Sequence, residues 1–219
     1  KEIAKKELKK KYINTLSPIK SNKFIDFSNA LPWVSEELIS INESTKPIFL
    51  SRNGIKVVSS FFNKFKEIMY PESKFEETIN WWNNKFDKAL KPPTDKVYWR
   101  PIIPEMLDSE NLEAGRRFKM ICYYWKICSE ESLKIINKQQ NSFLFKFEDL
   151  LVNKIKRQEF CDIVGVGADF LENKFQKPIN VAEPVSYKLD ESQKKVFSAI
   201  CSKTMETLKY KEVDYEVKY

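Results

Sequence analysis

Histidine is absent from the 219 residues of the chain, and glycine occurs only four times. Without histidine, the protein has no Ser-His-Asp or Cys-His catalytic set, no histidine-ligated zinc and no histidine general base. Proton transfer must therefore use Asp, Glu, Lys, Tyr or water. No apolar run approaches the roughly 20 residues that a membrane-spanning helix needs, so we expect no membrane span. Residues 1–12, KEIAKKELKKKY, lack the apolar region of a secretory signal.

Four cysteines, Cys122, Cys128, Cys161 and Cys201, show no spacing typical of a metal site. They predict buried free thiols and fit a reducing, cytoplasmic compartment. The net charge is +7, and the two signs alternate along most of the chain. That pattern is typical of a solvated surface, so we expect no nucleic-acid partner, although a modest positive field favours anionic ligands.

Three short segments rich in aromatic and branched residues predict strands: Phe24–Ser28, Ile48–Ser51 and Phe143–Phe147. Apolar periodicity and breakers predict helices from Ile55 to Met69 before Pro71, and over Phe75–Leu90, Leu112–Ile136, Lys154–Val164 and Glu191–Leu208, the last with Asp190 as N-cap. This alternation predicts one α/β domain over residues 1–219, with a mainly parallel sheet between two helical layers. Three strands are few for such a sheet, so either more strands lie in ambiguous stretches or the first precedes Lys1.

The stretch KPIFLSRNGIKVVSSFF, residues 46–62, begins as an apolar strand and ends as an amphipathic helix. Arg52 stands at the strand end, Asn53-Gly54 predicts a tight turn, and the helix start near Ile55 offers free N–H groups. In α/β sheets ligands bind at the carboxyl ends of strands, and an arginine beside a helix N-terminus suits phosphate. Ser60, two turns further, can face the same anion. The alternative is an ordinary strand-turn-helix whose arginine forms a surface ion pair, because Arg-Asn-Gly is too short to be specific.

This junction resembles the 3′-phosphate-binding segment of the PAPS-dependent sulfotransferases, in which a serine follows the strand-end arginine by eight residues and two aromatic residues follow the serine. Residues 125–165, WKICSEESLKIINKQQNSFLFKFEDLLVNKIKRQEFCDIVG, look like that family's block of a tryptophan-bearing helix, a strand and an aromatic-Glu-Asp-Leu turn. Residues 188–210 are similar to its C-terminal helix. The three blocks occur in the family's order and cover most of residues 22–210.

The resemblance implies a P-loop-kinase-like α/β architecture and transfer of a sulfuryl group from PAPS to a hydroxyl or amine, without a metal. Arg52 and Ser60, with Asn53 and Gly54 in the same segment, would bind the 3′-phosphate of PAPS or of 3′,5′-adenosine bisphosphate. Phe147 stands where the family often has a tyrosine against the adenine. It keeps a packing face and loses the hydroxyl, and a core phenylalanine is an equal alternative.

The family's phosphosulfate-binding loop, of the Pro-Lys-Ser-Gly-Thr-Thr kind, has no counterpart here, because none of the four glycines lies in a Gly-Lys-Ser/Thr context. The corresponding segment would precede residue 1, and the chain begins with Lys rather than Met. We therefore expect the first strand and the loop to lie upstream, and the alternative is a homologue that has lost transfer activity. If the loop is truly absent, this chain alone is not expected to be active.

Many cytosolic members of the family use a histidine base in the strand before the arginine segment. The corresponding stretch here, FIDFSNALP, offers Asp26 as the nearest candidate base, and the alternative is a strand residue that faces solvent or a helix end. Tyr98, Trp99 and Arg100 lie in the proline-rich segment 91–108, which we expect to form a loop against a small-molecule or carbohydrate acceptor.

Two other functions compete with the sulfotransferase. One is a nucleotide kinase or related phosphotransferase, which would need Mg²⁺ ligands and a Walker-type loop. The other is a non-catalytic module that binds a nucleotide or another anion. Arg116 and Arg117, at the start of a long helix, predict a solvated helix end, with an anion contact as the alternative. Neither the acceptor nor the oligomeric state follows from the sequence.

Overall fold

The structure is a computed structural model that describes residues 6, 9–10, 12–15, 18, 25, 35–42, 44–65, 70, 115–167, 169, 186–211 and 216–218. The strand predicted at 24–28, apart from Ile25, lies outside the described residues. The helix predicted at 75–90 and the loop predicted at 91–108 lie outside them as well.

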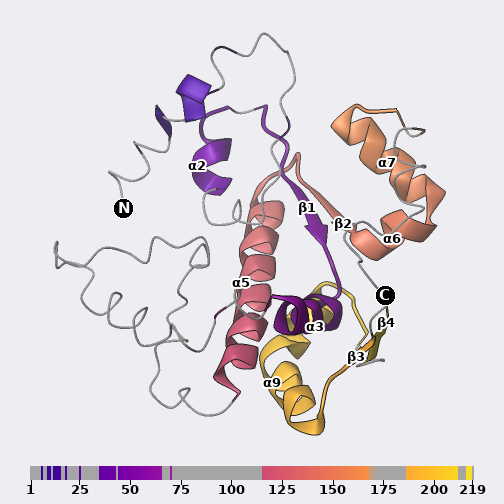
Figure 1. Cartoon of the computed structure of the whole chain (residues 1–219). Helices are drawn as coiled ribbons and strands as arrows, with labels where there is room; N and C mark the ends of the chain where they lie inside the picture. Colours follow the sequence, from indigo (N-terminus) through magenta and orange to yellow (C-terminus); the bar gives the residue numbers. More distant parts are fainter. Residues whose placement is uncertain are drawn as a thin grey trace, which may run out of the picture. The chain divides into compact units, whose positions relative to one another are not determined.

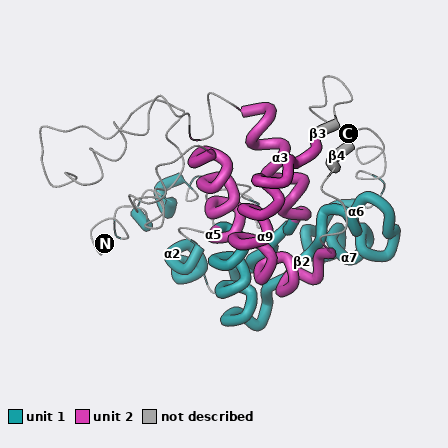
Figure 2. Tube along the Cα trace, turned by 90° about the horizontal axis from the view of Figure 1, so that it is seen from below, with its two compact units in different colours: residues 1–51, 128–179 teal, residues 52–127, 180–219 magenta. Residues whose placement is uncertain are grey.

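The chain divides into two compact units, each built from two segments that are distant in sequence. Unit 1 comprises residues 1–51 and 128–179, and unit 2 comprises residues 52–127 and 180–219 (Figure 2). The boundary falls at the end of a strand and within the long helix α5 (Arg116–Lys138), so that α5 contributes residues to both units.

Unit 1 contains a parallel pair of strands, β1 (Ile48–Ser51) and β2 (Phe143–Lys146), which lie side by side in Figure 1. The register pairs Ile48 with Phe143 and Ser51 with Lys146. Both strands were predicted, and β2 is one residue shorter than expected because Phe147 begins the next helix. The chain is therefore of mixed α/β class, with a small parallel sheet flanked by helices.

Two helices follow β2 in unit 1: α6 (Phe147–Val152) and α7 (Lys154–Val164). The predicted bounds of α7 are confirmed, since the side chain of Asn153 caps its first turn and Gly165 ends it in the left-handed conformation, with φ of 75°. The buried ring of Phe145 in β2 packs edge-on against Phe160 of α7, with ring centroids 5.4 Å apart. This contact fixes α7 to the sheet.

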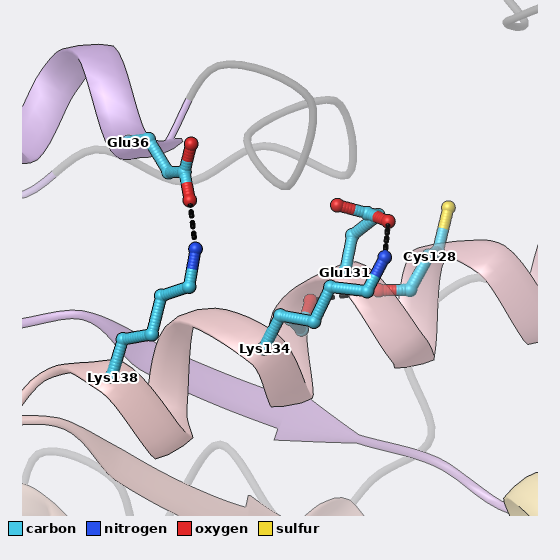
Figure 3. Close-up of polar contacts among 6 residues, drawn as sticks. Glu36, Cys128, Glu131, Lys134 and Lys138 are labelled. Carbon is cyan, nitrogen blue, oxygen red and sulfur yellow. Dashed lines mark hydrogen bonds and ion pairs between the residues drawn. The ribbon is translucent and has the colours of Figure 1, made fainter.

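Polar contacts on the surface of unit 1 involve α5 and the short helix α2 (Ser35–Ile39) (Figure 3). Lys138 Nζ lies 2.7 Å from Glu36 Oε1, and Lys134 pairs with Glu131 one turn away. The two residues of the first pair are exposed by about 60%, so the pair contributes little to stability.

Unit 2 contains α3 (Gly54–Lys64), the first half of α5 and α9 (Glu191–Thr207). α9 begins with a capping box between Asp190 and Gln193, which confirms the predicted N-cap. The core of this unit includes Ile55, Ile121 and Phe197, all almost completely buried. Apolar faces of three helices therefore meet here, as their periodicity predicts.

A second sheet in unit 2 was not predicted. β3 (Ser186–Lys188) and β4 (Glu216–Lys218) pair antiparallel. Each strand has only three residues, Ser-Tyr-Lys and Glu-Val-Lys, so its alternation of polar and apolar residues is too short to mark a strand in sequence. The expectation of a mainly parallel sheet therefore describes unit 1 and not this pair.

None of the four cysteines, all of which lie among the described residues, forms a disulfide. Cys122, Cys161 and Cys201 are buried, which confirms the prediction for these three, whereas Cys128 is half-buried. Within the described ranges, no helix is long and apolar enough to cross a membrane.

Candidate functional site

The junction from β1 to α3 contains three of the predicted site residues, and a fourth, Ser60, lies further along α3. Arg52 is the first residue after β1 and is half-buried. Asn53 is the N-cap of α3, with φ of −49° and ψ of 126°, and Gly54 is its first helical residue. The predicted tight turn is wrong: neither residue has a positive φ, and Gly54 is already helical directly after the N-cap Asn53.

The first N–H groups of α3 are engaged within the protein. Asn53 Oδ1 accepts a hydrogen bond from Ile55 N at 2.9 Å, and the carbonyl of Asn53 accepts one from Val57 N at 3.1 Å. Gly54 N donates to the sulfur of Met205 over 3.4 Å. The expectation that this helix start offers free N–H groups is therefore wrong for Gly54 and Ile55, and binding of an anion here must rely mainly on side chains.

Trp125 of α5 supports the junction at two points. Its indole Nε1 donates a hydrogen bond to the carbonyl oxygen of Arg52 at 3.2 Å. Its six-membered ring lies against Gly54, where an added Cβ would come within 2.8 Å of Cζ2. Gly54 is therefore required by the close approach of the tryptophan and not by a turn. The sequence placed Trp125 on a helix but gave no signal for this contact, which spans 73 residues.

Ser60 lies six residues after Gly54 on α3 and is half-buried. The axial rise over these six residues is about 9 Å. Lys56 precedes Ser60 by one helical repeat and therefore lies on the same face of the helix. The adjacent Ser59 is different: it is fully buried, and its hydroxyl has no hydrogen-bond partner among the described residues.

Phe147, the residue proposed for the adenine, is half-buried and opens α6 directly after β2. Glu148 and Asp149 follow it in the first turn, where carboxylates complement the positive end of the helix dipole. Phe147 belongs to unit 1, whereas Arg52, Asn53, Gly54 and Ser60 belong to unit 2. Arg52, Asn53 and Gly54 are consecutive in the chain, and Ser60 lies six residues further along the helix that begins at Gly54.

The remaining predicted site residues lie outside the described residues. These are the candidate base Asp26 and the candidate acceptor-loop residues Tyr98, Trp99 and Arg100.

Arg117 binds the other end of α3, which corrects the prediction of a solvated helix end. Its guanidinium donates hydrogen bonds to the carbonyl oxygens of Phe62 at 2.7 Å, Phe65 at 3.0 Å and Phe61 at 3.1 Å. The residue is 7% exposed. A cation at this position satisfies the last carbonyls and complements the negative end of the helix dipole, so Arg117 has a structural role.

Comparisons of the chain with protein-family models, with curated proteins and with solved structures give no match. Among the described residues, no group of three or more His, Cys, Asp or Glu side chains is placed to hold a metal ion. Among the described residues, the β1–α3 junction is where predicted site residues lie next to one another in the chain.

Proposed function

We propose that the chain is the PAPS-binding part of a sulfotransferase with a three-layer, P-loop-kinase-like α/β fold. It would bind the 3′-phosphate of PAPS, or of 3′,5′-adenosine bisphosphate, at the β1–α3 junction. The reaction would be in-line transfer of the sulfuryl group from PAPS to a hydroxyl or amine of a small-molecule or carbohydrate acceptor.

The observation that carries this proposal is the placement of Arg52 and Ser60. Arg52 is the first residue beyond a strand of a parallel pair, and Ser60 lies on the helix that begins two residues later. Ligands of α/β proteins bind at this end of a strand. Gly54 and Ser60 are separated by about 9 Å of helix rise, and Arg52 precedes Gly54 by two residues, so we expect the long side chain of Arg52 to reach a phosphate that Ser60 also contacts.

The chemistry of these residues fits a phosphate monoester. The guanidinium of Arg52 offers a fork of charged donors, and the hydroxyl of Ser60 offers one further donor. Lys56, on the same face as Ser60, adds positive charge beside them. Because the N–H groups of Gly54 and Ile55 have acceptors within the protein, the side chains carry the binding.

PAPS supplies the activated sulfuryl group, and the chain positions it. As in phosphoryl transfer, catalysis would consist mainly of positioning and charge stabilisation, with a base to accept the proton of the acceptor. Asp26 is our candidate for that base, and Tyr98, Trp99 and Arg100 are candidates for acceptor contacts. The proposed contact of Phe147 with the adenine rests on the family resemblance alone.

Calorimetric titration with 3′,5′-adenosine bisphosphate tests the cofactor assignment. We expect the wild-type chain to bind the bisphosphate. Arg52→Ala should weaken binding about tenfold or more, because hydrogen bonds between charged groups are stronger than those between neutral groups. Ser60→Ala should weaken binding severalfold. Its matched control is Ser59→Ala, which removes the neighbouring hydroxyl from a fully buried position and should leave the affinity unchanged.

Two results would overturn the proposal. If the wild-type chain does not bind the bisphosphate, the cofactor assignment fails. If Arg52→Ala binds as tightly as the wild type, the ligand occupies some other place and the junction is a structural feature. Binding of the bisphosphate without any transfer of a sulfuryl group would favour the non-catalytic module.

A further inference from the structure

From the geometry around the β1–α3 junction we infer that Trp125 is a positioning residue for Arg52. This inference rests on the proposed function, because it assigns Trp125 the task of fixing the arginine that would bind the 3′-phosphate. Trp125 would act through the backbone of the junction and would not touch the ligand itself.

Trp125 holds the junction in two ways that are independent of each other. The hydrogen bond from its indole Nε1 fixes the carbonyl oxygen of Arg52 at 3.2 Å. The ring blocks the space above Gly54, so that the start of α3 approaches α5 as closely as a glycine allows. One side chain therefore sets the position of both the last residue before the helix cap and the first residue of the helix.

The tryptophan is itself held firmly. It is 5% exposed, and its ring packs at a tilt against Phe197 of α9, with centroids 6.4 Å apart. The sulfur of Met205 accepts a hydrogen bond from the N–H of Gly54. Both Phe197 and Met205 are almost completely buried on α9. The backbone around Arg52 is thus tied to two helices that come from distant parts of the sequence.

A fixed backbone at Arg52 should strengthen the binding of a phosphate that Arg52 and Ser60 contact together. Arg52 lies outside the helix, so the cap geometry alone leaves its backbone orientation relative to Ser60 unspecified. The hydrogen bond to its carbonyl removes that freedom before the ligand arrives, and preorganisation of this kind raises affinity. Loss of the bond should therefore lower the affinity for a ligand that has a 3′-phosphate more than for one that lacks it.

The test is a double-mutant cycle between Trp125→Phe and Arg52→Ala. Phenylalanine keeps an aromatic ring and removes the indole N–H. The readout is the ratio of the dissociation constants of AMP and 3′,5′-adenosine bisphosphate, measured by calorimetry. This ratio isolates the 3′-phosphate, and it is insensitive to the fraction of unfolded protein because both ligands need the folded chain. Far-UV circular dichroism and urea denaturation of each variant show that it is folded.

We expect Trp125→Phe to reduce this ratio about fivefold in the wild-type background, as for the loss of one hydrogen bond, and to leave it unchanged in the Arg52→Ala background. An unchanged ratio in the wild-type background would overturn the inference. An equal reduction in both backgrounds would also overturn it, because Trp125 would then act independently of Arg52.

The two proposals fail in different ways. If the wild-type chain binds the bisphosphate no more tightly than AMP, the 3′-phosphate site itself is refuted, and the role of Trp125 falls with it. If the wild-type chain prefers the bisphosphate and Arg52→Ala abolishes the preference, the site stands, and the Trp125→Phe ratio alone decides the role of the tryptophan. Gly54→Ala is a second probe, since its methyl group must displace the same ring and should reduce the ratio without altering Trp125.

Discussion

The guanidinium of Arg117 lies over the ring of Phe62, 4.9 Å from the ring centroid, and donates a hydrogen bond to the carbonyl oxygen of the same residue. These two residues are 55 positions apart in the chain. Through this contact and the bonds to Phe61 and Phe65, one arginine of α5 ends the helix that carries Ser60.

Arg117→Lys keeps the charge and removes the planar fork. The three hydrogen bonds come from two separate nitrogens, Nη1 and Nη2, which a single ammonium nitrogen cannot replace, and the planar contact with the ring of Phe62 is lost as well. We therefore expect a loss of about 2 kcal/mol in the free energy of unfolding. Urea denaturation measures it. Arg157→Lys is the matched comparison, because Arg157 donates to the carbonyl oxygens of Leu150 and Leu151 from a more exposed position and should lose less. A stability of Arg117→Lys equal to that of the wild type would contradict the capping role.

Gly54→Ala should destabilise the protein, against the usual trend. In a helix this substitution normally stabilises by about 1 kcal/mol, whereas the new methyl group here meets the ring of Trp125 and should cost about 1–3 kcal/mol. The control is Gly167→Ala, since a Cβ at Gly167 meets nothing within 4 Å. Thermal unfolding of both variants checks the sign. A raised melting temperature for Gly54→Ala would show that the ring does not lie against this glycine.

Asp190 should make the N-terminus of α9 sensitive to acid. The backbone N–H of Gln193 and the hydroxyl of Ser192 donate to its carboxylate at 2.8 Å and 2.7 Å, and these bonds hold the pKa of Asp190 below its ordinary value. Because the pKa is lower in the folded state, the carboxylate stabilises the fold above an unfolded-state pKa of about 4 and loses that contribution as the pH falls through the folded value.

Asp190→Asn keeps a capping oxygen and removes the titration. We expect the wild type to lose more stability than this variant between pH 5 and about pH 2, as measured by urea denaturation at several pH values. If the stability of the two proteins depends on pH in the same way, the titration of Asp190 does not contribute to the stability of the fold.

The thiols should react with iodoacetamide at very different rates. Burial and a hydrogen bond with Cys201 raise the pKa of Cys122 well above its ordinary value, so this group stays protonated and inert. Cys161 and Cys201 are also buried, whereas Cys128 is half-buried. Mass spectrometry of the native protein should find Cys128 modified first and the other three only in denaturant. Rapid labelling of Cys122 or Cys201 in the native protein would contradict the packing of α5 against α9.

Local signals in the sequence were sufficient for several elements. The strand Ile48–Ser51 and the helix Lys154–Val164 have their predicted bounds, because apolar runs, an Asn cap and a final Gly act within a few residues. Asp190 was likewise predicted as a cap and has that role.

Distant contacts determine what the sequence could not predict. The prediction that the helix starting near Ile55 extends to Met69 is wrong, since α3 ends at Lys64, and Arg117 of α5 binds carbonyl groups at that end. The close approach of Trp125 is what requires glycine at position 54. From the sequence alone, Asn53-Gly54 predicts a tight turn, because glycine after asparagine usually marks one. The actual reason for the glycine is the ring of Trp125, which lies on another helix and cannot be recognised from the local sequence. The sequence therefore suggested a candidate site, but it could not predict the contacts that hold the backbone of that site in place.

The most direct test of the central claim compares the binding of 3′,5′-adenosine bisphosphate and AMP to the wild-type chain and to Arg52→Ala by calorimetry. We predict that the wild type binds the bisphosphate about tenfold or more tightly than AMP, and that Arg52→Ala binds the two ligands with similar affinity. Equal affinity of the wild type for both ligands, or a preference that survives the loss of Arg52, would contradict the proposed 3′-phosphate site.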